Sequence, residues 1–127
     1  MRILSGYVLV FFGAGIGGAM RHGINAAAMR LLGSFPYGTL TVNVVGSLVM
    51  GLLTGWFAAK ADPGQGWRLF LTAGILGGFT TFSAFSLDAV LLYERDQLGL
   101  TALYVLASVV VSIGALFAGL FVVRSIP

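Results

Sequence analysis

The sequence predicts an all-α integral membrane protein with four transmembrane helices. Of its 127 residues, 58% are hydrophobic and only 9% are charged, whereas a soluble domain carries about 25% charged residues. Four uncharged runs are each close to the roughly 20 residues that a helix needs to cross the hydrocarbon core. They are Ile3–Met20, Leu31–Ala59, Leu69–Leu87 and Gln97–Val123.

These runs fill the chain, so we expect residues 1–127 to form a single transmembrane domain. The expected helices span about 4–28, 37–60, 67–94 and 98–124, with the third broken near its middle. The chain has no cysteine and a single histidine, and no paired carboxylates lie within a membrane run. We therefore do not expect an enzyme. The basic residues form no cluster, so we expect no nucleic-acid partner.

Basic residues are distributed almost evenly between the two expected membrane faces. One face carries Arg2, Lys60, Arg68 and Arg124, and the other carries Arg21, Arg30 and Arg95. Because a bias in Lys and Arg sets orientation, a near tie predicts insertion in both orientations and an antiparallel, dual-topology homodimer. The alternative is that one charge or the order of insertion sets a single orientation.

The first helix contains Gly13 and Gly17, four residues apart, which is a spacing that allows close helix packing. Arg21 follows the strongly apolar part. Its side chain either reaches the interface or supplies positive potential at an aqueous vestibule. His22 has no partner ligand in the pattern and is a weak metal candidate.

The second helix carries one face of small and polar residues, spaced four apart. The face comprises Thr39, Asn43, Ser47, Gly51 and Gly55. Gly51 and Gly55 indicate packing. An amide inside the membrane must be hydrogen-bonded, so Asn43 either joins helices or faces an ion path.

The third helix contains Gly77-Gly78-Phe79-Thr80-Thr81, which favours a break because glycine and β-branched threonine both weaken a helix. A broken helix at membrane depth is tolerated where it is buried in protein or lines a water-filled path. Asp88 is the acid nearest to membrane depth. It either faces water at the helix end or lines the path.

The fourth helix carries hydroxyl groups at steps of three, four and four residues along one face. They belong to Thr101, Tyr104, Ser108 and Ser112. Single serines in membrane helices usually bond their own backbone, but four aligned hydroxyls favour a track for a solute that accepts hydrogen bonds.

The polar groups on these faces are neutral and compact, which suits a small anion. Phe82 and Phe85 share a face, and the positive edge of a phenyl ring can coordinate an anion weakly. Carbonyls freed between Gly77 and Thr80 would suit a cation such as Na⁺.

These motifs resemble those of the Fluc-type (CrcB) fluoride channels, over essentially the whole chain. The resemblance is carried by Gly38-Thr39-Leu40-Thr41-Val42-Asn43, by Gly77-Gly78-Phe79-Thr80-Thr81-Phe82-Ser83-x-Phe85-Ser86 and by the Tyr104/Ser108/Ser112 ladder. It implies a passive, fluoride-selective channel that exports fluoride and lowers its cytoplasmic concentration. It also implies a dual-topology homodimer with two pores, multi-pass in the bilayer of the bacterial inner (plasma) membrane.

The resemblance also implies roles for individual residues. Phe82 and Phe85 would be the pore phenylalanines and Asn43 the pore amide. The polar track would comprise Thr39, Ser83, Tyr104, Ser108 and Ser112. Backbone carbonyls of Gly77 and Thr80, from both subunits, would hold a structural Na⁺ that is not transported. Members of the family often carry Glu where this chain has Asp88.

Two other functions are alternatives to a fluoride channel. Small multidrug transporters are also four-helix, dual-topology proteins, and resemble one another in a membrane-buried Glu in helix one. Ile3–Met20 contains no acid, which argues against that function. A non-conducting structural membrane subunit would need the glycine faces but not the aligned hydroxyls.

Overall fold

The computed structural model describes residues 2–127, with side chains from Ile3 onward, and it is all-helical. Among these residues, four helices are long and apolar enough to cross a membrane, which confirms the predicted fold class at this level. The first, second and fourth spans are α1 (Arg2–Leu32), α2 (Tyr37–Ala59) and α6 (Leu98–Arg124). α1 therefore runs past both ends of the expected 4–28. The third span is divided into α3 (Gln65–Arg68), η1 (Leu69–Leu76), α4 (Gly77–Phe79) and α5 (Phe82–Glu94).

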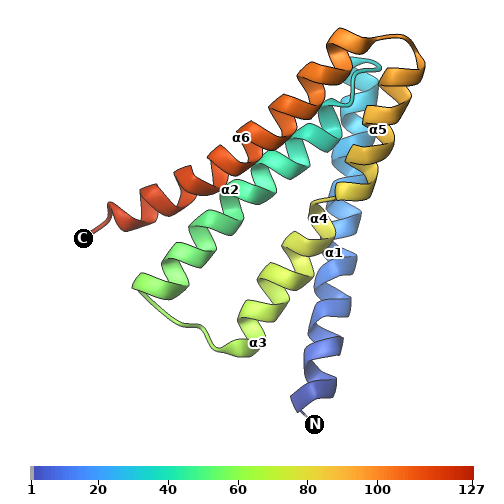
Figure 1. Ribbon diagram of the computed structural model, residues 1–127. Helices are drawn as coiled ribbons and strands as arrows, with labels where there is room; N and C mark the ends of the chain where they lie inside the picture. The colour runs from blue at the N-terminus through green and yellow to red at the C-terminus, as the bar shows by residue number, and fades with distance from the viewer. Residues whose placement is uncertain (1) are drawn as a thin grey trace.

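Successive spans run in opposite directions (Figure 1). α1 ends at Leu32, and the next residue, Gly33, has a φ of +93°, a left-handed conformation that glycine adopts without strain. The loop before α3 turns at Gly64, with a φ of +94°. The α1–α2 and α5–α6 connections lie together at one end of the molecule, and the N-terminus and α3 lie toward the other.

The spans pack as two pairs through glycine faces. α2 packs mainly against α6, and α1 packs against η1 and α4 (Figure 1). A Cβ added at Gly13 would lie 2.7 Å from the Phe70 carbonyl oxygen, and one at Gly55 would lie 3.2 Å from the Val123 Cβ. Side chains at Gly17 and Gly51 would likewise meet the backbone of the facing helix. The predicted packing role of these four glycines is confirmed.

The third span is interrupted between α4 and α5, near its middle. Thr80 and Thr81 are extended, with φ and ψ of −87° and 159° and of −155° and 122°. Thr81 caps α5 because its hydroxyl accepts a hydrogen bond from the Ala84 amide at 3.1 Å. The turns of η1 before the break are π-helical, a departure from regular helix that the sequence did not predict.

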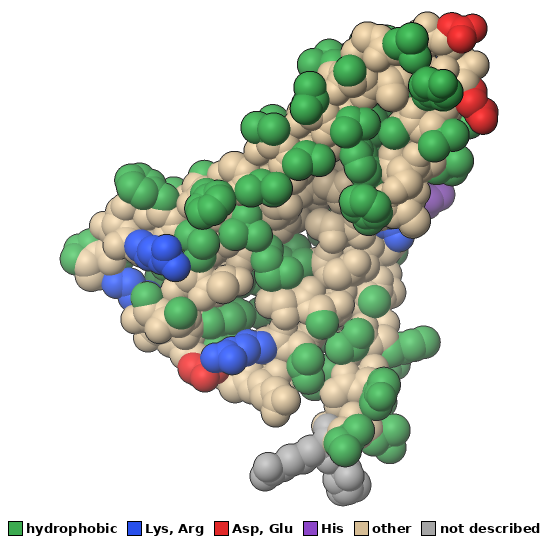
Figure 2. Space-filling view, viewed as in Figure 1, with side chains coloured by type: hydrophobic (Ala, Val, Ile, Leu, Met, Phe, Trp, Pro, Cys, Tyr) green, Lys and Arg blue, Asp and Glu red, His purple; other side chains and the backbone are tan. Residues whose placement is uncertain are grey.

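The two pairs diverge from each other in the half of the molecule that holds α3 (Figure 1), and the surface is hollowed between them (Figure 2). A cavity of about 480 Å³ lies there, between α2, α6 and the break in the third span. The helix break is therefore set beside an open cavity.

Candidate functional site

The cavity beside the break collects polar and aromatic side chains from three spans. Its lining includes Asn43 and Ser47 of α2, Thr80, Phe82 and Phe85 at the break, and Ser108 and Ser112 of α6. Most of the predicted pore residues therefore meet here, although they are up to about 70 residues apart in the chain. Thr39, Ser83 and Tyr104 lie outside this lining.

Ser108 and Ser112 present hydroxyl oxygens that are buried and have no hydrogen-bond partner in the described chain. This is unusual, because a buried hydroxyl without a partner costs about 1–3 kcal/mol. Thr101, the first residue of the predicted ladder, behaves differently. Its hydroxyl donates to the Gln97 carbonyl of its own helix at 2.8 Å. The ladder that faces the cavity is therefore shorter than the predicted one.

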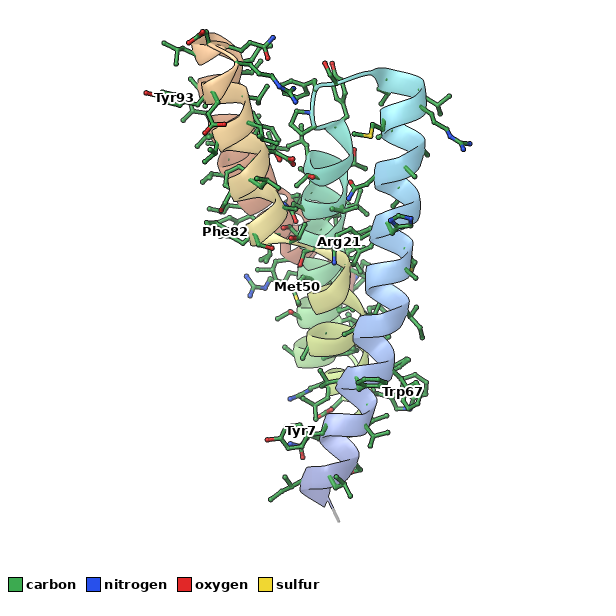
Figure 3. The ribbon with its side chains drawn as sticks, turned by 90° about the vertical axis from the view of Figure 1, so that its right-hand side faces the viewer. Tyr7, Arg21, Met50, Trp67, Phe82 and Tyr93 are labelled. Atoms are coloured by element: carbon green, nitrogen blue, oxygen red, sulfur yellow. The ribbon has the colours of Figure 1, made fainter. Side chains whose placement is uncertain are left out.

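Three neighbouring aromatic rings, those of Phe82, Phe85 and Tyr104, lead away from the cavity and are called the aromatic line below. The rings of Phe82 and Phe85 are 5.5 Å apart, and the rings of Phe85 and Tyr104 are 5.3 Å apart. Phe85 is buried, whereas Phe82 is 78% exposed and points away from the bundle (Figure 3). The two phenylalanines are in contact, as their spacing predicted, but only one of them is enclosed by this chain.

Tyr104 joins this line to a second cavity. It is fully buried and its hydroxyl donates to the Asp88 carboxylate at 3.1 Å. The second cavity, of about 440 Å³, lies between α1, the α1–α2 loop and α5, and its lining includes Thr39, Asp88 and Arg95. Asp88 therefore lines a cavity and bonds a side chain of α6, rather than only facing water at the helix end.

Asn43 uses both ends of its amide on the backbone of the break. Its Oδ1 accepts from the Thr81 amide at 2.8 Å, and its Nδ2 donates to the Thr81 carbonyl at 3.0 Å. Of the two predicted roles, joining helices is the one that these contacts display. One N–H of the amide group is left over for other contacts, because an NH₂ group carries two hydrogens.

The carbonyls of Gly77 and Thr80 lose their usual helical donors. In a continuous helix the Thr81 amide would bond to Gly77, but it donates to Asn43 instead. The Ala84 amide would bond to Thr80, but it donates to the Thr81 hydroxyl. Within the described chain no group of three or more His, Cys, Asp and Glu side chains could hold a metal ion. The break therefore releases two backbone carbonyl oxygens from the helical pattern, and carbonyl oxygens are ligands that a hard cation can take.

Arg21 lies at the break rather than at the membrane interface. Its Nε donates to the Gly78 carbonyl at 3.0 Å, and the side chain reaches from α1 toward α4 (Figure 3). Gly78 is near the middle of the span Gln65–Glu94. Arg21 therefore contacts the backbone of the third span, and the even distribution of basic residues over the two membrane faces stays a prediction.

Ser83 is the second residue of α5 and is exposed, with its hydroxyl 3.4 Å from that of Thr81. Two residues at the site belong to patterns that the sequence shows, but they were not predicted as pore residues. Ser47 lines the main cavity, and its place on the Thr39–Asn43–Ser47 face was the pattern that could have identified it. Thr81 pairs with Asn43 and caps α5, and no pattern in the sequence connects it to Asn43.

Comparison with known proteins gives a consistent set of relatives. A family model described as "CrcB-like protein, Camphor Resistance (CrcB)" matches residues 8–120. A protein of Methylobacterium nodulans named "Fluoride-specific ion channel FluC" is 62% identical over 117 residues, which cover 92% of this chain and 94% of that protein. A protein of the same name from Rhodopseudomonas palustris (strain BisB5) is 60% identical over 121 residues, covering 94% and 98% of the two chains. Another from Agrobacterium fabrum is 54% identical over 119 residues, covering 93% and 95%.

Proposed function

This chain belongs to the CrcB-like protein family, and from this membership we propose that it is a fluoride-selective channel. Fluoride crosses passively, down its electrochemical gradient, and its exit lowers the cytoplasmic concentration. Relatives that share more than half of their residues with this chain carry the name of a fluoride-specific ion channel. The four membrane-spanning helices suit a multi-pass protein of the bacterial inner membrane.

The observation that carries the proposal is the pair of buried, unpartnered hydroxyls of Ser108 and Ser112 beside the cavity. A buried donor without an acceptor is costly, and an anion that accepts hydrogen bonds removes this cost as it passes. Fluoride is a small anion with a strong demand for hydrogen bonds. It would exchange part of its hydration shell for these hydroxyls and for the remaining N–H of Asn43.

The aromatic line continues the proposed route. Phe82 and Phe85 offer ring edges with partial positive charge. The contacts from Phe85 to Tyr104 and on to Asp88 lead toward the second cavity, which Thr39 also lines. Ring edges coordinate an anion weakly and exclude water, so they favour a small anion that fits between them. Asp88 would lie at one end of this route, at the second cavity, and Arg21 would add positive charge beside the break.

We further propose an antiparallel homodimer with two pores. The main support is that the route is open on one side in a single chain, with Phe82 78% exposed at its edge. A second copy in the opposite orientation would cover this opening and give two equivalent routes. The near tie of four basic residues on one expected face against three on the other also favours insertion in both orientations.

The proposal includes a structural Na⁺ held by the Gly77 and Thr80 carbonyls of both subunits. Such an ion would supply fixed positive charge close to the anion route. The diverted donors of these two carbonyls support the site. Replacing Na⁺ by K⁺ or by a large organic cation should lower fluoride flux, and undiminished flux would leave this carbonyl site without a function.

The central test is anion efflux from proteoliposomes that contain the purified protein. Fluoride efflux should follow the electrochemical gradient, without a proton requirement, and should greatly exceed chloride efflux. Equal fluxes of the two anions would overturn the proposed selectivity. Orientation is tested separately, with a C-terminal reporter that is active on one side of the membrane only. A single orientation would overturn the antiparallel dimer and leave the permeation result standing.

A further inference from the structure

The break in the third span is surrounded by hydrogen bonds from outside that span. A helix that opens at Thr80 and Thr81 loses backbone bonds, and in the membrane each unsatisfied group is costly. Two side chains of other helices supply partners at this point. Asn43 comes from α2, 38 residues away in sequence from Thr81, and Arg21 comes from α1, 57 residues away from Gly78.

Asn43 makes the bonds that a neighbouring strand would make. Thr81 is extended, so its N–H and C=O can both point at one partner, as in a hydrogen-bonded pair of an antiparallel sheet. The Asn43 amide matches them with an acceptor at 2.8 Å and a donor at 3.0 Å. One side chain thereby satisfies both polar backbone groups of the same extended residue.

Arg21 stabilises the other side of the break. The helical half that ends at Phe79 presents its last carbonyls toward the break, and this end of a helix carries partial negative charge. The Arg21 Nε bonds the Gly78 carbonyl at 3.0 Å, and a guanidinium stays charged at any physiological pH. The single ion pair found in the described chain joins Arg68 to Asp62, so no acidic side chain competes for Arg21.

We propose that Asn43 and Arg21 are positioning residues that hold the third span in its broken form, by replacing hydrogen bonds that the backbone loses there. We call the contacts of Asn43 and Arg21 with the break the lock. Because the Thr81 amide donates to Asn43, it does not bond the Gly77 carbonyl, and that carbonyl stays available to a cation. The effect on a cation rests on the proposed function, whereas the lock itself rests on the contacts alone.

Hydrogen–deuterium exchange of the full-length protein tests the lock without reference to transport. Asn43→Ala should make the amides from Thr81 to Phe85 exchange about tenfold faster, the scale of one lost buried hydrogen bond. Asn25→Ala is the matched control, because Asn25 is another half-buried amide that lines the second cavity. Unchanged exchange in Asn43→Ala would overturn the proposal.

Arg21 is tested with two variants that separate its hydrogen bond from its charge. Arg21→Gln keeps an N–H donor and should retain most of the protection around Gly78, whereas Arg21→Leu should lose it. Arg30→Leu, at the exposed end of α1, should leave this region unchanged. Equal exchange in Arg21→Leu and the native protein would show that Arg21 does not hold the break.

The Na⁺ dependence of fluoride flux is a second readout. It would not change if Asn43 only lined the pore. If the lock shapes the cation site, Asn43→Ala should raise the Na⁺ concentration that gives half-maximal fluoride flux. A lower flux with unchanged Na⁺ dependence and unchanged exchange would assign Asn43 to the pore alone and overturn the positioning role. If the native flux does not depend on Na⁺, the proposed cation site fails, and the exchange experiment still decides the lock.

Discussion

Replacing Ser108 or Ser112 by alanine should increase stability and decrease fluoride flux. Both hydroxyl oxygens are buried without a partner, so the folded protein bears a desolvation cost of about 1–3 kcal/mol for each. Alanine removes the hydroxyl and leaves almost the same volume. We expect the free energy of unfolding of each variant to be about 1 kcal/mol higher than that of the native protein.

The same change removes a donor from the proposed route. A hydrogen bond to a charged partner contributes about 1.5–3 kcal/mol, and each 1.4 kcal/mol in a barrier changes a rate about tenfold. If the hydroxyl stabilises fluoride at the highest point of its path, flux should fall by about tenfold or more. Ordinary core residues behave in the opposite way, because their truncation lowers stability.

The assay pairs fluoride efflux from proteoliposomes with thermal unfolding in detergent for each variant. Ser125→Ala is the matched control, since Ser125 follows the same helix and donates to the Phe121 carbonyl at 2.7 Å. It should leave flux unchanged and gain no stability. Loss of stability in Ser108→Ala together with native flux would refute the reasoning, because the hydroxyl would then be a satisfied structural group.

Three further predictions concern the rest of the site and the packing of α2 against α6. Phe82→Ile and Phe85→Ile keep bulk but remove the ring edge, so fluoride flux should collapse while size-exclusion chromatography still shows the intact assembly; near-native flux would overturn the aromatic route. Ser47→Ala should reduce flux several-fold without loss of stability, as its hydroxyl lines the same cavity, and unchanged flux would remove Ser47 from the route. Gly119→Val should lower the unfolding temperature clearly, because a Cβ there would lie 2.8 Å from the Leu52 nitrogen, and an unchanged temperature would contradict the close α2–α6 packing.

The sequence by itself determined the spans, the packing glycines and the place of the break. Length and hydropathy are sufficient for the spans, because the hydrocarbon core sets the helix length. Spacing identified Gly13 and Gly17 as a close contact, since residues four apart lie on one helix face. The sequence Gly77-Gly78-Phe79-Thr80-Thr81 predicted the break because local propensities act over a few residues.

Only the tertiary structure decided which partners these groups meet. Periodicity assigns Asn43 to a face of α2, but the bond to Thr81 depends on how α2 lies against the third span. In the sequence, Arg21 only follows the end of an apolar run. Because α1 packs against α4, its side chain lies beside the Gly78 carbonyl. Thr101 bonds its own helix while Ser108 does not, although spacing treats them alike. Hydrogen-bond partners far apart in sequence are chosen by the geometry of helix packing, which a one-dimensional pattern does not contain.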